Sequence, residues 1–464
     1  MYPTLFRNVI FPSLDVLNRT QVSRIHRSLE KSQWYPRERL DSLQREKLGQ
    51  IVDFTRQRSD FYRDFWQNAD PSRRASSNFP ALDGLPIVTK NDLRPVQDQF
   101  PLTDERTLRV KTSGSTGEPM TYQRTATQES WFWALRIRMW QWGGYVPGEP
   151  YLSLNLNART AWRKKLQDVI FRCSYHGFNA NQNDVDAVLR DLERKKVRHL
   201  VGYASSLYLL SQAMKKRGIG NPGVRSILAT GDTLFPTYRQ AIEEVFGVGV
   251  VDYYGAGGEG FHLASQCEER GLYHLHVENS VVEVLRDGRP ARPGEMGEIV
   301  VTQLDNHAMP LVRYATHDVG QLTDVETCAC GREMPLIQGV LGRVPDIVVA
   351  PDGSALVVHF FTILFEYLDG IRQFQIVQRE PERIVARIVR GDDYQQEAIE
   401  THVRKAVAEV TSGTLGVEYE YPESIPLSRS NKRRLVISEL ATAPLAVDGS
   451  STERLVSAVP SDDA

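Results

Sequence analysis

The sequence is poor in three features, and each shortage excludes a class of protein. It has only four cysteines in 464 residues, too few for a scaffold held by disulfides. It has no excess charge of one sign, because 56 basic side chains stand against 58 acidic ones. A net charge of -2 gives no broad positive field for nucleic acid or for an anionic membrane. We therefore expect small molecules or other proteins as partners.

Long apolar runs are the third shortage. The most hydrophobic stretch, Ala355 to Phe365, ends at Glu366 and is far shorter than the ~20 residues that cross a bilayer. The first residues lack the basic region, apolar stretch and small-residue cleavage site of a secretory signal. The sequence therefore predicts a cytoplasmic protein without a transmembrane helix, and it leaves open whether the protein is a monomer or a homodimer.

Hydrophobic residues make up 41% of the chain, which is enough for two to four folded units at ~100 to 200 residues each. Apolar side chains recur at three- and four-residue spacings over residues 20–70, so we expect a helical lead-in at 1–79 that is part of the large domain. From about residue 80, apolar runs such as Ser226 to Thr230 alternate with helical patterns such as Tyr238 to Phe246. This alternation predicts an α/β fold with a largely parallel sheet.

The pattern changes twice towards the C-terminus. After about Glu278 strand patterns follow one another without long helices, which predicts a β-rich subdomain that closes a large domain at 80–345. Residues 346–440 alternate strands and helices and predict a small α+β domain. The remaining residues, 441–464, are rich in Ala, Ser, Pro and Asp and predict a disordered tail.

The most distinctive local motif is Lys111-Thr-Ser-Gly-Ser-Thr-Gly-Glu-Pro119, between two strand patterns. Glycines let a turn present several backbone N–H groups to one anion, and the Ser and Thr hydroxyls add donors. The motif therefore predicts a phosphate-binding loop. It is not a Walker loop, because no Gly-Lys-[Ser/Thr] ending follows at the required spacing. An ordinary Ser/Gly hairpin loop is the alternative.

A second glycine segment, Gly255-Ala-Gly-Gly-Glu-Gly260, formally matches the dinucleotide pattern G-x-G-x-x-G and follows a strand pattern. Glu283 then stands where that pattern has its ribose-binding carboxylate. However, the stretch FHLASQCEERG after Gly260 predicts only a short helix, and no second βαβ half is evident. An NAD(P)-binding oxidoreductase and a plain glycine-rich turn both remain as alternatives.

Three weaker clusters follow: Arg313-Tyr-Ala-Thr-His-Asp318, Gly342-Arg343-Val-Pro-Asp346 and Ser428-Arg-Ser-Asn-Lys432-Arg-Arg434. Each alone is typical of a strand end, a turn or a solvated run of charge. The order and spacing of these three clusters and the two glycine segments together indicate a function that none of them indicates alone.

The five segments together resemble the adenylate-forming (acyl-CoA synthetase) superfamily, and specifically its phenylacetate-CoA ligase branch, including related proteins encoded with capsule polysaccharide genes. The resemblance covers residues 20 to 440. It implies a large N-terminal domain with several subdomains and a small, mobile C-terminal domain. It also implies ATP- and Mg²⁺-dependent adenylation of an aromatic or other organic acid, followed by thioester formation with coenzyme A. A carrier-protein phosphopantetheine, an amine or a sugar is the alternative acceptor, and a member that only binds is a further alternative.

The resemblance also implies a role for each motif residue. Carried over by position, Thr112, Ser113, Gly114, Ser115, Thr116 and Gly117 hold the ATP phosphates, Gly231 and Asp232 lie near the nucleotide, Tyr254 and Gly255 flank adenine, Glu259 binds Mg²⁺, Asp318 and Arg343 contact the ribose, Asp346 is the hinge, and Lys432 stabilises the adenylation transition state. The glycine segment is one residue longer than the family's Tyr-Gly-x-x-Glu, so the position of Glu259 depends on how the loop bulges.

Cysteine and histidine residues suggest a metal site. Cys267, Cys328 and Cys330, with one histidine, have the ligand types of tetrahedral Zn²⁺. The resembled branch shares this pattern, which implies a structural zinc. His274 and His276 alternate along a strand, so only one faces the metal, and we favour His274. Reduced, partly buried thiols without metal are the alternative.

Overall fold

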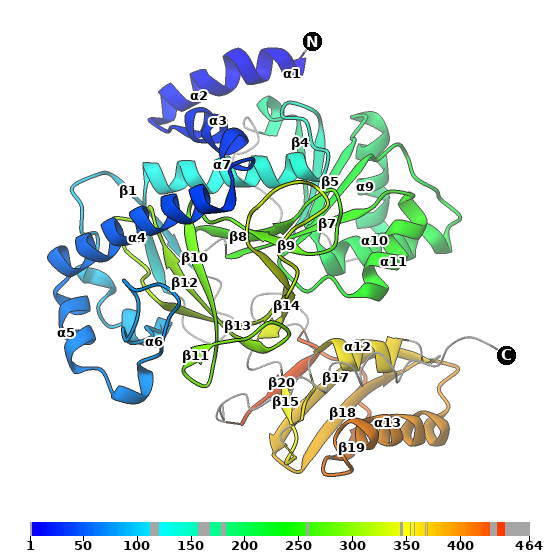
Figure 1. The fold of residues 1–464 in the computed structure, drawn as a ribbon. Coiled ribbons are helices and arrows are strands. Elements are labelled where there is room, and N and C mark those ends of the chain that lie inside the picture. Colours follow the sequence, from blue (N-terminus) through cyan, green and yellow to red (C-terminus); the bar gives the residue numbers. More distant parts are fainter. Residues whose placement is uncertain are drawn as a thin grey trace.

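The computed structural model describes residues 2–111, 120–155, 168–177, 182–256, 259–343, 347–352, 354–356, 358–366, 368, 370–426 and 434–440. The N-terminal helices are α1 (Tyr2–Leu5), η1 (Phe6–Ile10), α2 (Phe11–Asn18), α3 (Val22–Ser32), α4 (Arg37–Arg58) and α5 (Asp60–Asn68). The apolar spacing in α4 buries Leu40, Leu48 and Ile51 on one face. The predicted helical lead-in is therefore present, and it runs along the top and side of the molecule in Figure 1.

Twelve strands form one large sheet in the order β11-β10-β12-β13-β14-β9-β8-β7-β6-β5-β3-β4. Its parallel part consists of β3 (Tyr151–Asn155), β4 (Cys173–Gly177), β5 (His199–Tyr203), β6 (Ser226–Thr230) and β7 (Val250–Ala256). The helices α9 (Gln182–Arg194), α10 (Ala204–Lys216) and α11 (Pro236–Phe246) alternate with these strands. This arrangement is the α/β pattern expected from the sequence.

The antiparallel part continues the same sheet. It consists of β8 (Phe261–Gln266), β9 (Tyr273–Leu275), β10 (Ser280–Arg286), β11 (Arg289–Pro290), β12 (Met296–Gln303), β13 (Tyr314–Leu322) and β14 (Leu336–Arg343). The short helix expected after Gly260 is wrong, because that stretch forms β8. All six residues of β8 are buried between β7 and β9, and an amphipathic surface helix would leave half of them exposed.

Shorter elements join the lead-in to the sheet: η2 (Pro71–Arg73), α6 (Lys90–Leu93), η3 (Gln97–Gln99) and the antiparallel pair β1 (Thr107–Lys111) and β2 (Thr121–Thr125). The strand β2 leads directly into α7 (Ala126–Trp142), whose first turn is capped by the Thr125 side chain. Helix α7 packs against α3 on one side and β8 on the other, so its aromatic residues serve mainly as core.

The C-terminal module, residues 347–440, has a sheet of its own below the large sheet in Figure 1. It consists of β15 (Val348–Val349), β16 (Ala355–Leu356), α12 (Val358–Glu366), β17 (Ile371–Glu380), β18 (Arg383–Arg390), α13 (Gln396–Val410), β19 (Gly416–Glu420) and β20 (Val436–Ser438). Its four-stranded sheet has the order β19-β18-β17-β20. The two helices close an apolar core that also includes Phe235 from the start of α11.

The expectations about a transmembrane helix, the hinge and the C-terminal tail have different outcomes. No helix in the part of the chain that the structure describes is both long and apolar enough to cross a membrane. The expected hinge, Asp346, and the expected tail at 441–464 lie outside the described residues. The predicted boundaries near residues 79, 345 and 440 stay predictions.

Candidate functional site

The segments expected to contact adenine and ribose meet through one hydrogen bond. Tyr254, near the end of β7, donates its hydroxyl to Asp318 Oδ2 on β13 at 2.6 Å. Thr316 Oγ1 lies 3.4 Å from the same hydroxyl and accepts the Asp318 backbone N–H at 3.1 Å. On the adjacent strand β14, Arg343 is the register partner of Asp318. Two motifs that are 64 residues apart therefore contribute side chains to one place.

The end of β6 carries the predicted pair Gly231 and Asp232. Gly231 has φ +83°, and a Cβ there would lie 2.3 Å from the ring of Tyr203, so only glycine fits. The Asp232 carboxylate accepts a hydrogen bond from the Ser205 hydroxyl. Because β5, β6 and β7 are parallel, their carboxyl ends share one edge of the sheet, which is where α/β proteins bind ligands.

Glu259 lies beside the strand that follows the predicted phosphate loop. Burial, and then the Glu259 carboxylate, raise the pKa of the Tyr122 phenol on β2. The Glu259 carbonyl accepts from Gln303 Nε2 at 3.1 Å. At Gly255 the pairing between β7 and β8 shifts register, and this bulge accompanies the longer glycine segment. The Glu259 carboxylate lies close to Tyr122 on β2.

Several predicted residues cannot be compared with the structure. The phosphate-loop residues Thr112, Ser113, Gly114, Ser115, Thr116 and Gly117, together with Asp346 and Lys432, lie outside the described residues. The strands on either side of the loop are paired as far as Lys111 and Thr121. The roles of these eight residues stay predictions.

Four predicted metal ligands come together. The donor atoms of Cys267, His274, Cys328 and Cys330 all lie within 4.8 Å of one another. The Cys267 and Cys328 sulfurs are 3.7 Å apart, and Cys330 Sγ is 3.5 Å from His274 Nε2. In a tetrahedral zinc site with Zn–S bonds of ~2.3 Å, sulfurs are about 3.8 Å apart, so the spacing fits the ion.

The other histidine has different partners. His276 Nδ1 lies 2.8 Å from an Arg138 nitrogen, and its Nε2 lies 3.4 Å from the Ser265 hydroxyl. His274 is therefore the imidazole that faces the three sulfurs. Burial lowers the pKa of His274 to about 4, and burial with the neighbouring thiols raises the pKa of Cys267 to about 12. A neutral imidazole is ready to bind metal, whereas crowded thiolates need a cation to offset their charge.

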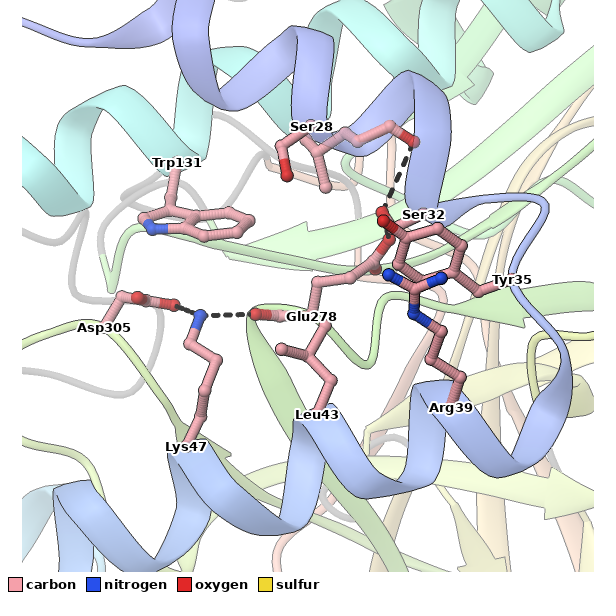
Figure 2. Close-up of a pocket in the computed structure, with 10 residues that line it drawn as sticks. Ser28, Ser32, Tyr35, Arg39, Leu43, Lys47, Trp131, Glu278 and Asp305 are labelled. Atoms are coloured by element: carbon pink, nitrogen blue, oxygen red, sulfur yellow. Dashed lines mark hydrogen bonds and ion pairs between the residues drawn. The ribbon is translucent and has the colours of Figure 1, made fainter.

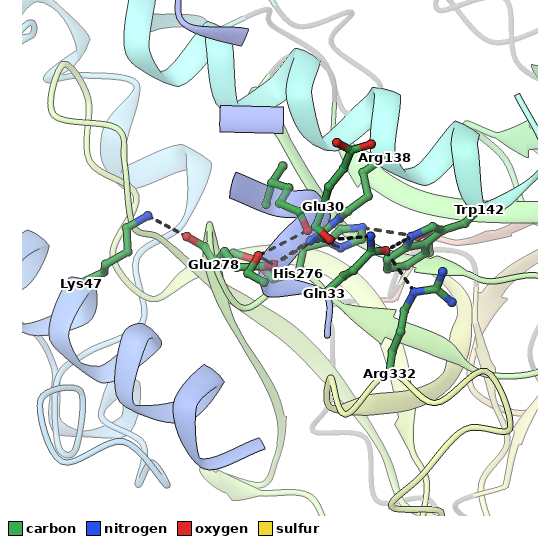
Figure 3. A network of polar contacts seen from close by, with 12 residues as sticks. Glu30, Gln33, Lys47, Arg138, Trp142, His276, Glu278 and Arg332 are labelled. Carbon is green, nitrogen blue, oxygen red and sulfur yellow. Dashed lines mark hydrogen bonds and ion pairs between the residues drawn. The ribbon is translucent and has the colours of Figure 1, made fainter. Parts of the chain in front are cut away.

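A polar network that includes Arg332, two residues after Cys330, reaches the N-terminal helices (Figure 3). Arg332 lies between the rings of Trp34 and Trp142, at 4.7 and 4.5 Å, and donates to Gln33 Oε1 at 3.2 Å. Trp142 Nε1 donates to the same oxygen at 2.7 Å. Further along, Arg138 forms a buried ion pair with Glu278 at 2.6 Å.

A cavity of about 460 Å³ lies between α3, α4 and α7 (Figure 2). Two of its charged groups have partners within the protein, because Lys47 pairs with Asp305 at 2.6 Å and Glu278 pairs with Arg138. Lys47 also lies 4.1 Å from the ring of Trp131. No predicted site residue lines this cavity, so it is separate from the predicted nucleotide site.

Some residues that contact the predicted site residues belong to none of the five motifs. Tyr203 ends β5 and Ser205 lies at the start of α10, and only the fold shows that they contact Gly231 and Asp232. Tyr122 belongs to no motif, although its position directly after the phosphate loop is a signal of proximity to that loop.

Comparison with known proteins agrees with this geometry. A family model for the CapK C-terminal domain matches residues 348–439. A phenylacetate-coenzyme A ligase from Thermus thermophilus is 25% identical over 449 residues, covering 87% of this chain and 97% of that protein. The phenylacetate-coenzyme A ligase of Escherichia coli is 24% identical over 288 residues, covering 58% of this chain and 63% of that enzyme.

Solved structures agree on the fold. A 2-hydroxyisobutyryl-CoA ligase in the postadenylation state superposes with a TM-score of 0.68 at 20% identity, and the match covers 92% of this chain and 94% of that one. The expected fold class, a large α/β part followed by a small C-terminal part, is confirmed. The chain is therefore a homologue of phenylacetate-coenzyme A ligases over most of its length, its residues 348–439 match the CapK C-terminal domain, and its fold is similar to that of a CoA ligase.

Proposed function

We propose that this protein is an AMP-forming acid–thiol ligase that activates an organic acid with ATP and transfers the acyl group to coenzyme A. The observation that carries the proposal is the hydrogen bond from Tyr254 to Asp318, because it joins the predicted adenine and ribose segments. The carboxyl ends of the neighbouring parallel strands β6 and β7 support it, since they carry Gly231, Asp232 and Gly255 at one edge of the sheet.

The chemistry has two steps. A substrate carboxylate oxygen attacks the α-phosphorus of ATP, the bond to the β-phosphate bridging oxygen breaks, and pyrophosphate leaves. The thiolate of coenzyme A then attacks the acyl carbon, and AMP leaves with the electron pair of the broken C–O bond. The first step brings two anions together, so the site needs cationic groups and oriented backbone N–H groups where negative charge accumulates.

The residues of this chain divide that work. In the proposal Asp318 accepts hydrogen bonds from the ribose hydroxyls, while Tyr254 holds its carboxylate in place. Lys432 supplies positive charge beside the reacting phosphate and leaves with the C-terminal module before the second step. Glu259 would hold Mg²⁺, which neutralises phosphate charge when bound; one carboxylate with phosphate oxygens and water is a usual set of Mg²⁺ ligands.

We also propose that Cys267, His274, Cys328 and Cys330 hold a structural Zn²⁺. Four protein ligands leave no open position for substrate, which is typical of a structural rather than a catalytic site. In this proposal the ion joins the β8–β9 turn and β9 to the segment between β13 and β14.

ATP–pyrophosphate exchange tests the first step, and acid-dependent release of AMP on addition of coenzyme A tests the second. A panel of aryl and alkyl acids covers both kinds of organic acid. We expect Lys432→Ala to lower exchange by about 10²- to 10³-fold, the loss typical for removal of one transition-state charge partner.

The matched control is Lys405→Ala on α13. The Lys405 side chain is exposed, and within the described residues its ion pair is with Glu409 at 3.9 Å, so its loss should leave exchange unchanged. Wild-type exchange in Lys432→Ala would contradict the assigned role. A folded protein that binds ATP but gives no exchange with any acid would contradict the adenylation proposal for the acids tested.

The NAD(P) alternative loses its structural basis. A dinucleotide fingerprint needs a helix after its glycines, whereas β8 follows Gly260. Glu283, which that alternative assigns to the ribose, forms a buried ion pair with Arg313 at 3.1 Å instead. Titration with NADH checks this point, and we expect no binding.

A further inference from the structure

Three side chains without an assigned role lie directly behind the predicted adenine segment. Phe132 and Arg136 stand one turn apart on α7, and His262 stands on β8. The rings of Phe132 and His262 are stacked, with centroids 4.3 Å apart and planes at 18°. His262 is the register partner of Gly255, where an added Cβ would lie 2.9 Å from His262 Nδ1.

His262 is buried without a hydrogen bond. It is 3% exposed, and neither ring nitrogen has a hydrogen-bond partner within the described part of the chain. Burial, and then Arg136 and Arg124, hold its pKa well below the usual value, so the ring is neutral. A neutral imidazole offers one donor and one acceptor, and leaving both unused in a protein interior is costly.

Arg136 is a cation surrounded by aromatic rings. Its guanidinium carbon lies 4.7 Å from the centroid of Phe132, 4.8 Å from Trp133 and 6.0 Å from Trp140. Its Nε is buried without a hydrogen bond, and among the described residues no carboxylate pairs with it. Guanidinium groups in such a setting bind carboxylates in a bidentate manner, because the N–H groups lie at the edges of the plane and not on its faces.

The nearby acidic side chains are already close to a different arginine. Arg124 pairs with Glu129 at 3.1 Å, and Glu259 also acts on Arg124 electrostatically. Arg124 is on β2, which follows the phosphate loop, whereas Arg136 is nearly three turns into α7. Of the two arginines, Arg136 is thus the one placed further along the chain from the phosphate loop.

We infer that Arg136 and His262 recognise a second acidic group on the substrate, so that the preferred acid is a dicarboxylate whose remote carboxylate binds Arg136. In this inference Phe132 holds the His262 ring by stacking and so positions it, and His262 donates one further hydrogen bond to the acid. This inference rests on the proposed function, because it places the acid beside the adenylate site.

The experiment compares matched acids with and without a remote carboxylate: 4-carboxyphenylacetate against phenylacetate, and adipate against hexanoate. ATP–pyrophosphate exchange gives kcat/KM for each acid, and calorimetry measures binding of each acid in the presence of AMP. We expect the diacid of at least one pair to be preferred by about ten- to a hundredfold, the range for a hydrogen bond to a charged group.

Variants assign the preference to a residue. Arg136→Met keeps the length of the side chain and removes the charge, so it should abolish the preference and leave the monoacid rate within about twofold. Arg136→Lys should restore part of it. Arg45→Met, at an exposed arginine on α4, is the control and should retain the wild-type preference.

The outcomes separate this inference from the proposed function. If wild type shows no preference for a diacid and Arg136→Met leaves exchange with monoacids unchanged, the inference is wrong and the adenylation proposal still holds. A rise in KM for ATP with every acid also overturns it, because Arg136 would then bind phosphate. Diacid binding that depends on Arg136 without any exchange supports the inference and contradicts the proposed function. Neither exchange nor diacid binding contradicts both.

Discussion

At the scale of single residues, the site depends on a phenol that fixes a carboxylate. The hydroxyl of Tyr254 contacts Asp318 at 2.6 Å, and Thr316 supports the same carboxylate through the backbone. A preoriented acceptor loses less conformational freedom when a ribose binds, so part of the affinity for ATP comes from a residue that need not touch the ribose itself.

Tyr254→Phe removes this hydrogen bond and keeps the aromatic ring. We expect ATP to bind about fivefold more weakly, because a hydrogen bond of this kind contributes ~1 kcal/mol net. Calorimetric titration with ATP measures the change. Tyr421→Phe is the matched control, since Tyr421 donates to Glu400 in the C-terminal module, and an equal loss in both variants would contradict the role of Tyr254.

The sequence predicts which residue types form the site but not how they contact one another. Tyr254 and Asp318 were identified separately, because each belongs to a motif of the resembled superfamily. Their mutual hydrogen bond depends on how β7 and β13 lie in a sheet of twelve strands, and strand order is a non-local property. Arg136 and His262 belong to no motif, and only the packing of α7 on β8 shows that they lie close to the predicted adenine segment.

At the scale of elements, the strand β7 carries a buried carboxylate that responds to pH. Asp252 accepts a hydrogen bond from Tyr273 at 2.5 Å, and burial raises its pKa to about 7. A raised carboxyl pKa means that the folded state favours the neutral acid. The stability that this group contributes is therefore complete below pH ~4 and is lost as the pH rises through about 7.

Asp252→Asn should remove this pH dependence. When the pH rises from 5 to 8, the free energy of unfolding of wild type should fall by on the order of 3 kcal/mol more than that of the variant. Each unit of pKa corresponds to ~1.4 kcal/mol. Thermal unfolding at the two pH values measures the difference. Asp53→Asn, at an exposed carboxylate on α4, should not change it, and a wild-type profile for Asp252→Asn would contradict the argument.

The elements themselves were mostly predictable, because apolar periodicity distinguishes the helices of the α/β part from its strands. The exception is β8, for which the sequence indicated a short helix. The six residues of β8 are buried, and two of them are His262 and Gln266, whose polar side chains hide the strand pattern. Burial on both faces of a central strand removes the alternation from which strands are identified.

At the scale of the whole molecule, the cysteine cluster joins parts that are distant in sequence. Its ligands come from the β8–β9 turn, from β9 and from the segment before β14. That segment also contacts the N-terminal helices, because Glu333 accepts the Arg37 backbone N–H at 2.8 Å and Arg332 donates to Gln33. An ion at the cluster would therefore stabilise the contact between the lead-in helices and the sheet.

Removal of the metal tests this connection. We expect the purified protein to contain about one zinc per chain and a strong chelator to lower its Tm by roughly 5–10 °C, since ~1 kcal/mol shifts Tm by a few degrees in proteins larger than 150 residues. Cys328→Ser should lose the zinc, whereas Cys173→Ser, at the cysteine outside the cluster, should retain it. Hydrogen exchange should then rise in α3 and at the start of α4, because the metal no longer holds the segment that carries Arg332 and Glu333. Wild-type protein without zinc, or exchange that rises only around the cysteines, would contradict this coupling.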